Sequence, residues 1–223
     1  SWSQMGGGIN KRFSFIDNCT CGTSSPSLYL KKENEKDLLY YCLAFLNSNV
    51  SKSIIQILSP TTLSVLSSDV SSLPFVINKD YFDETVILAK QLVLLARYGS
   101  SLHEENREFN PHYFSKNDLL INIFCDFEKE LNQKRENVVK SKDRLDAIFC
   151  EIYELDDVDK FYFDIDSIIS TPSTSNFVYS LISYAIGVSF GRYSLDVEGL
   201  AYAGGDWNPD LYSTIIPDDN NII

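Results

Sequence analysis

The stretch SKNDLLINIFCDFEKELNQKRENVVKSKDRLDAIFCEIYEL, residues 115–155, has the strongest periodicity in the chain. Apolar residues recur in it every seven positions, at Phe124, Leu131, Val138, Leu145 and Ile152. A companion row of apolar residues is interrupted at its centre by Lys134 and Ser141. A seven-residue repeat is typical of helices that pack along one face. The stretch therefore predicts either one long helix with a weak centre or two antiparallel helices packed as a hairpin.

Further helices are expected on both sides of this stretch. The apolar spacing predicts helices over 36–47, 81–98 and 175–191, and a short helix after 36–47 that runs through Leu58. Gly99 is expected to end the helix over 81–98. The first 35 residues are rich in Gly, Ser, Asn and Thr around short apolar pairs, which predicts short strands and turns.

Together these elements predict an α+β fold that is predominantly helical. Residues 1–79 are expected to form a small mixed α/β part. Residues 80–160 are expected to form a spacer, either a long helical hairpin or a coiled-coil-like helix. Residues 161–223 are expected to form a C-terminal region of helix and turns that continues beyond the chain. A hydrophobic content of 44% over 223 residues is enough for a buried core.

The charge of the chain is unevenly distributed. The net charge is −12, but residues 1–79 hold seven basic and five acidic groups, whereas residues 80–223 hold twelve basic and 26 acidic groups. Because nucleic-acid phosphates attract Lys and Arg, any DNA contact is expected in the first third. The candidate DNA-binding residues are Lys11, Arg12, Lys31, Lys32 and Lys52. The alternative for Lys11 and Arg12 is that they only keep a strand edge soluble.

Other classes of site find little support. The five cysteines form no disulfide framework, which indicates reduced thiols in a cytoplasmic protein, and their spacing predicts no metal site. Two histidines in one loop predict no nucleophilic triad. No apolar run approaches the roughly 18 residues that span a bilayer, and no signal peptide is visible, so no membrane partner is expected.

Three glycine or Asn-Pro motifs invite a functional interpretation. MGGGIN (5–10) has no preceding strand and is interpreted as a hairpin tip instead of a phosphate loop. FNPHYF (109–114) follows a polar segment and is interpreted as a loop instead of a base-binding motif. In GVSFGRYSLDVEGLAYAGGDW (187–207), Gly187, Gly191, Gly204 and Gly205 are interpreted as helix-packing and turn glycines.

Several stretches resemble one group of enzymes. Residues 43–77, LAFLNSNVSKSIIQILSPTTLSVLSSDVSSLPFVI, are similar to the closing part of the target-recognition domain of large restriction-modification methyltransferases. LDAIFCEIYELDD (145–157) resembles a helix end downstream of such domains. SYAIGVSFGRYSLDVEGLAYAGGDW (183–207) resembles the C-terminal half of the PglX family, the adenine-specific DNA methyltransferases of BREX phage-defence systems. The opening SWSQMGGGINKRFSF also fits the recognition region of that family.

The resemblance implies a DNA-recognition and spacer fragment of an S-adenosylmethionine-dependent adenine-specific (N6) DNA methyltransferase. Residues 1–79 would be the end of its target-recognition domain. Its expected partners are double-stranded DNA, the missing methyltransferase domain of the same polypeptide and other phage-defence proteins. The family's methyl-donor loop and Asn-Pro-Pro-Tyr motif match no residues here, so no catalytic or cofactor-binding residue is assigned and the chain alone is expected to be inactive. The alternative is a protein-interaction scaffold of a defence complex without direct DNA contact.

Overall fold

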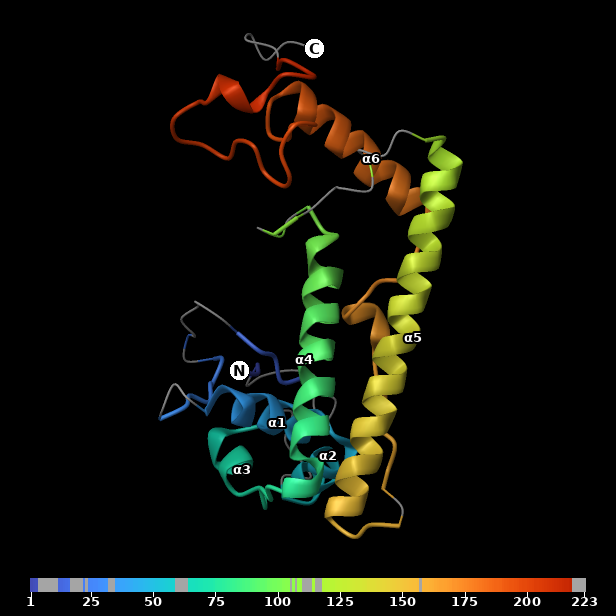
Figure 1. The fold of residues 1–223 in the computed structure, drawn as a ribbon. Helices are drawn as coiled ribbons and strands as arrows, with labels where there is room; N and C mark the ends of the chain where they lie inside the picture. The colour runs from blue at the N-terminus through green and yellow to red at the C-terminus, as the bar shows by residue number, and fades with distance from the viewer. Residues whose placement is uncertain are drawn as a thin grey trace. The chain divides into compact units, whose positions relative to one another are not determined.

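The fold is almost entirely helical. The computed structural model describes residues 1–3, 12–16, 22, 24–31, 35–58, 64–104, 106, 108–109, 114, 118–156 and 158–217. The helices are α1 (Lys36–Asn47), α2 (Asn49–Leu58), α3 (Ser67–Ser71), α4 (Lys79–Ser101), α5 (Leu120–Ile152) and α6 (Thr174–Ser189), with short 3₁₀ turns at Ile165–Ser167 and Pro209–Leu211 (Figure 1). The sequence-based bounds of 36–47 for α1 are confirmed, and the other predicted helices are confirmed to within about three residues.

The predicted mixed α/β part is wrong for the residues that the structure describes, because none of them forms a strand. The single bridge among them joins Tyr193 and Leu200. Near the N-terminus, Ser14 donates its amide to the Ser1 carbonyl at 2.8 Å, and Trp2 donates its amide to the Pro26 carbonyl at 3.2 Å. These are isolated bonds and not a ladder. The side chains of Trp2 and Phe13 are buried in a core formed by helices, and they do not belong to strands with side chains on alternate faces of a sheet.

The described residues form two compact units. Unit 1 comprises Ser1–Leu94 and Asn137–Asp164, and unit 2 comprises Leu95–Glu136 and Ile165–Ile223. In unit 1, α1, α2 and α3 share a core with the first part of α4 and the last part of α5 (Figure 1). Unit 2 contains the remaining parts of α4 and α5 together with α6 and the irregular segment that follows it.

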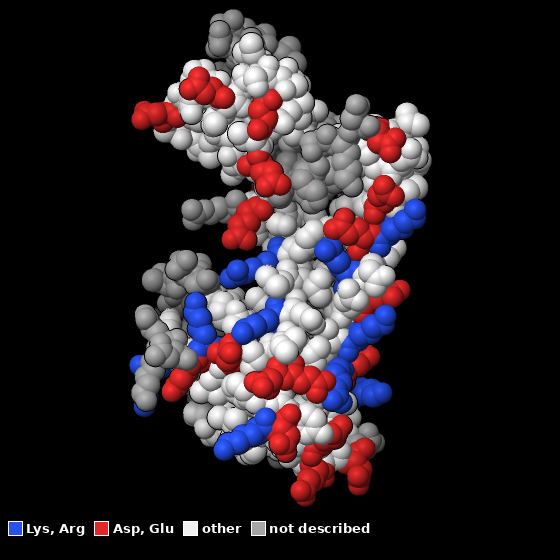
Figure 2. Space-filling view, in the orientation of Figure 1, with Lys and Arg blue, Asp and Glu red and all other residues white. Residues whose placement is uncertain are grey.

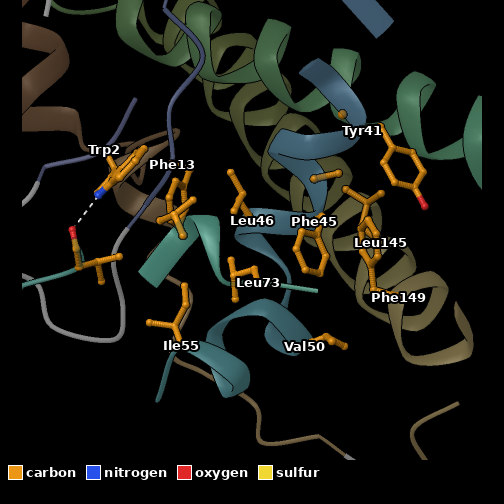
Figure 3. Close-up of a cluster of buried hydrophobic side chains, with 14 of the residues drawn as sticks. Trp2, Phe13, Tyr41, Phe45, Leu46, Val50, Ile55, Leu73, Leu145 and Phe149 are labelled. Atoms are coloured by element: carbon orange, nitrogen blue, oxygen red, sulfur yellow. Dashed lines mark hydrogen bonds between the residues drawn. The ribbon is translucent and has the colours of Figure 1, made fainter. Parts of the chain in front are cut away.

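Among the residues that the structure describes, the core of unit 1 contains five buried aromatic side chains along with aliphatic ones (Figure 3). Tyr41 and Phe149 are fully buried, and their rings pack edge to face with centroids 5.8 Å apart. The Phe45 ring lies 5.6 Å from the Phe149 ring. The Tyr41 hydroxyl donates to the Val76 carbonyl at 3.1 Å, so this large ring is buried without an unpaired polar tip.

Only Ser48 separates α1 from α2, and its side chain stabilises the junction between the two helices. Ser48 donates its hydroxyl to the Phe45 carbonyl at 2.7 Å and accepts the Ser51 amide at 3.1 Å. The same hydroxyl therefore satisfies a carbonyl at the end of α1 and an amide at the start of α2, as a capping serine does. The turn is local, but Ser48 itself is buried.

The interrupted repeat of residues 115–155 forms the single helix α5, one of the two predicted alternatives. Leu131, Val138 and Leu145 are each at most 3% exposed, which confirms the seven-residue row. The interruption at Lys134 has a physical cause, because its ammonium lies 4.2 Å from the centre of the Tyr98 ring within unit 2.

The predicted end of α4 at Gly99 is wrong. The helix continues to Ser101, and Gly99 lies inside it, buried against the 165–169 segment of unit 2. A Cβ at this position would lie 1.8 Å from the Ile168 carbonyl oxygen. Gly99 thus serves close packing between two segments and does not terminate the helix.

Candidate nucleic-acid interface

The backbone beside Arg12 is held by a side-chain clamp. Asn47, the last residue of α1, accepts the Phe13 amide at 3.1 Å and donates to the Phe13 carbonyl at 3.0 Å. The Phe13 ring is buried against Trp2, with centroids 5.4 Å apart. The Trp2 indole N–H donates to the Val65 carbonyl at 2.9 Å. An extended segment without strand partners is therefore anchored next to a candidate DNA-binding residue.

Arg12 itself is exposed, and its guanidinium donates to the Asp164 carbonyl oxygen at 3.3 Å. A guanidinium keeps its positive charge at physiological pH and presents several N–H donors in a planar fork, a geometry that suits a phosphate or a base edge. Lys31 is also exposed. Lys11 and Lys32 lie outside the described residues. The structure thus places Arg12 and Lys31 on the surface of unit 1.

Lys52 lies in a different environment. It is only 6% exposed, on α2, and is influenced by the charges of Lys142, Asp146 and Arg12. Burial, followed by repulsion from Lys142, lowers the pKa of Lys52 to about 8, against the opposing attraction of Asp146. In its described position the Lys52 ammonium is covered by protein and does not form part of the exposed surface.

The carboxylate of Asp146 organises this buried polar cluster. It accepts the Asn49 amide at 2.9 Å and the Asn49 side-chain amide at 3.0 Å, and it pairs with Lys142 one helical turn away. Asn49 begins α2, so a carboxylate from α5 caps the start of that helix. Sequence inspection missed this pair, because the two residues are 97 positions apart.

Replacing Lys52 by methionine is expected to stabilise unit 1 at pH 7 by about 1–2 kcal/mol, because a buried charge is exchanged for an apolar chain of similar length. The lowered pKa means that the unfolded chain holds more protons between pH 8 and 10.5, so the native chain gains stability as pH rises through this window. Lys52→Met should remove that gain. Urea unfolding at several pH values measures the change in the free energy of unfolding, and Lys31→Met, at an exposed position, is the control. The prediction would be contradicted if this free energy changed equally with pH in the native and Lys52→Met chains.

The glycine-rich segment after α6 is confirmed as a helix stop and turns. Gly191 has φ +76°, its amide donates to the Val188 carbonyl at 3.0 Å, and the Arg192 amide donates to the Gly187 carbonyl at 2.8 Å. This is the pattern of a Schellman helix end, in which glycine takes the left-handed position. A Cβ on Gly187 would lie 2.5 Å from the Tyr193 ring, so that glycine permits close packing. Gly204 and Gly205 also have positive φ values, of 108° and 92°.

These glycines do not fit a methyl-donor pocket. Such a pocket requires a strand, a glycine loop and a helix in succession, and the described residues contain no strand. The space beside Gly187 is filled by Tyr193, and the space beside Gly191 by Trp207. No group of three or more His, Cys, Asp or Glu side chains in the described ranges is placed to hold a metal ion. No helix in those ranges has the length and apolar character needed to cross a membrane.

Asp196 is a structural anchor that sequence inspection missed. It accepts the amides of Ser213 and Thr214 at 2.7 and 2.9 Å, and the Thr214 hydroxyl at 2.6 Å. These bonds, with those from Thr214 contributing most, hold the pKa of Asp196 far below its usual range. The carboxylate thereby ties residues 213–214 to the turn that follows α6.

Asp196→Asn is expected to release residues 208–217, because an amide group presents N–H donors where the backbone also presents donors. In the native chain this anchor is complete above the unfolded aspartate pKa of about 3.9 and is lost as pH falls through the lower folded pKa. The protection factors of the amides in 208–217, which correct the exchange rates for the intrinsic pH dependence of amide exchange, should therefore be unchanged between pH 7 and pH 5 and fall on further acidification. Exposed Asp206→Asn is the control, and unaltered exchange in Asp196→Asn would refute the anchoring role.

Comparison with known proteins identifies the class to which the chain belongs. No protein-family model matches it. It is 34% identical over 203 residues to the adenine-specific methyltransferase PglX of Lacticaseibacillus casei (strain Zhang), a match that covers 85% of this chain and 16% of that protein. It is 27% identical over 194 residues to the adenine-specific methyltransferase BrxX of Escherichia coli O9:H4 (strain HS), covering 77% of this chain and 15% of that protein.

The chain therefore corresponds to one segment of PglX-like proteins, which are named adenine-specific methyltransferases. This confirms the resemblance inferred from the sequence. The match spans about one-sixth of the length of each relative.

Proposed function

We propose that this chain is a DNA-contacting and spacer part of an S-adenosylmethionine-dependent, adenine-specific DNA methyltransferase in a BREX phage-defence system. The similarity to PglX over 85% of the chain carries this proposal. In such an enzyme another part of the polypeptide would hold the methyl donor and transfer the methyl group to the N6 atom of a flipped adenine. The residues described here would help to hold the duplex.

The proposed contact surface lies on unit 1 around Arg12. Its side chain is exposed, and the neighbouring Phe13 backbone is held in place by Asn47. By sequence, unit 2 holds seven basic and fifteen acidic residues, whereas unit 1 holds twelve and sixteen. Phosphates would be repelled more strongly by unit 2, which favours unit 1 as the DNA-facing part.

Arg12→Ala in the complete methyltransferase is expected to lower the rate of target methylation, or to relax target choice, by about 5- to 150-fold, corresponding to the roughly 1–3 kcal/mol of an arginine contact to a base edge. If Arg12 serves only a phosphate, the salt slope of binding should fall by about one unit instead. The measurements are methylation of the target and of single-base variants, and DNA affinity at several salt concentrations.

The matched control is Lys129→Ala, because Lys129 is a 79% exposed cation on α5 whose nearest acid, Asp126, is 4.0 Å away. It should methylate as the unmodified enzyme does. An Arg12→Ala enzyme with unchanged rate, target choice and salt slope would show that the recognition surface lies elsewhere.

The second candidate function is a protein-interaction scaffold of the defence complex that does not contact DNA. The observation that favours it is the uncharged, partly exposed helix α6. The scaffold function would be supported if replacing each exposed cation of unit 1 by alanine left the DNA affinity of the complete enzyme unchanged.

A further inference from the structure

Helix α6 is unusual for a helix at a protein surface. Its sequence, TSNFVYSLISYAIGVS, contains no Asp, Glu, Lys or Arg over 16 residues. One side packs into unit 2 through Phe177, Tyr184 and Val188, each at most 6% exposed. The opposite side is also apolar. A helix with apolar residues on two opposite faces normally buries both of them.

The apolar residues of the opposite side form a continuous row, which we call the α6 stripe. Val178, Ile182 and Ile186 follow one another at four-residue spacing and are 42%, 52% and 48% exposed, and Phe190 continues the row at 38%. Residues four apart lie on the same face of a helix, one above the other. Tyr179, 70% exposed, lies beside the row. A contiguous apolar row of this kind marks an interaction site, whereas single exposed apolar residues are ordinary.

Charge argues against DNA as the occupant of the α6 stripe. Between residues 174 and 217 the chain has four acids, Asp196, Glu198, Asp206 and Asp210, and one cation, Arg192. Figure 2 shows acidic side chains across the part of unit 2 that follows α6. An uncharged row in a region whose net charge is negative suits an apolar protein surface better than the phosphates of DNA.

We propose that the α6 stripe is the docking surface for the remainder of the methyltransferase polypeptide. This inference rests on the proposed function. The match with PglX spans 16% of that protein, so more than four-fifths of such a polypeptide lies outside the segment described here. A surface in the same chain is present at a high effective concentration, so a short apolar row is sufficient for stable docking. The docked surface is apolar and carries no acidic group opposite the stripe.

The test uses the complete polypeptide with photoreactive benzoylphenylalanine in place of Ile182. Irradiation should join α6 to a peptide of the same polypeptide outside these 223 residues. The matched control is the same replacement at Ile87, which is 56% exposed on α4 but has Asp83 and Gln91 four residues away on either side, so it forms no apolar row. We expect the intramolecular cross-link from position 182 to exceed that from position 87 by about ten-fold or more, as a fully covered contact does over an open one.

A charge substitution supplies the second readout. Ile182→Glu introduces an unpaired carboxylate into the proposed contact and should raise hydrogen exchange in the cross-linked peptide by about ten-fold. Ile87→Glu should leave that peptide unchanged. Cross-links from position 182 to a second copy, to a different protein or to lipid, or none above the control, would overturn the proposal.

Neither readout requires DNA, so this test is separable from the Arg12 test. If position 182 cross-links as expected but Arg12→Ala methylates normally, the docking proposal stands and the proposed DNA contact is wrong. If the cross-link is absent but Arg12→Ala lowers methylation, only the docking proposal is wrong.

Discussion

Phe149→Ala is expected to lower the free energy of unfolding of unit 1 by about 3–5 kcal/mol, the range for truncating a fully buried phenylalanine. Phe149 has no exposed surface, and its ring contacts the rings of Tyr41 and Phe45 at centroid distances of 5.8 and 5.6 Å. It comes from α5, whereas both partners come from α1. The truncation therefore leaves a cavity where the long helix and the first helix meet, and rigid neighbouring rings fill such a cavity poorly.

The two tryptophans allow unit 1 to be observed separately. Trp2 belongs to unit 1 and is 4% exposed, while Trp207 belongs to unit 2 and is 46% exposed. In a Trp207→Phe background, the fluorescence of Trp2 during urea unfolding reports unit 1. Val139→Ala, at a 41% exposed position of the same helix, is the control and should change stability by no more than about 0.5 kcal/mol. A loss below about 1 kcal/mol for Phe149→Ala would contradict this description of the core.

Gly99→Ala is expected to destabilise unit 2 by about 3 kcal/mol, at the upper end of the usual cost of overpacking. The sign is the informative part, since replacing glycine by alanine inside a helix ordinarily gains up to about 1 kcal/mol. Here the new Cβ would lie 1.8 Å from the Ile168 carbonyl oxygen and 3.2 Å from the Ile169 side chain. Because the obstacle is backbone, relief requires the 165–169 segment to move away from α4.

Hydrogen exchange of residues 95–104 and 165–173 measures this effect locally. Ser100→Ala is the control, because Ser100 is the exposed neighbour in the same helix and should gain a few tenths of a kcal/mol from helix propensity alone. Slower exchange in Gly99→Ala than in the unmodified chain would mean that α4 and the 165–169 segment are not in contact.

Local chemistry accounts for the features that could be predicted from the sequence. The bounds of α1 follow from apolar spacing within twelve residues, and the burial of Leu131, Val138 and Leu145 follows from a seven-residue repeat. The glycines after α6 were interpreted correctly as packing and turn residues, because a helix stop needs a residue that tolerates positive φ. The similarity to PglX was also recognisable from the residues between 183 and 207.

Predictions failed where a residue's role depends on a partner far away in the sequence. Gly99 was expected to end a helix, but it is packed against Ile168. Apolar pairs near the N-terminus were expected to form strands, but Phe13 is clamped by Asn47, 34 residues away. No local sequence pattern distinguishes an apolar residue of a β-strand from an apolar residue of an irregular segment that is buried against helices.

The candidate site divides in the same way. The sequence by itself determined the helices, their apolar faces and the concentration of positive charge in the first third, since these depend on composition and spacing. Only the tertiary structure decided that Arg12 is presented at the surface while Lys52 is buried beside Asp146. The physical reason is that burial of a charge is settled by which distant side chains surround it, and the same lysine is a surface cation or a buried amine according to that environment.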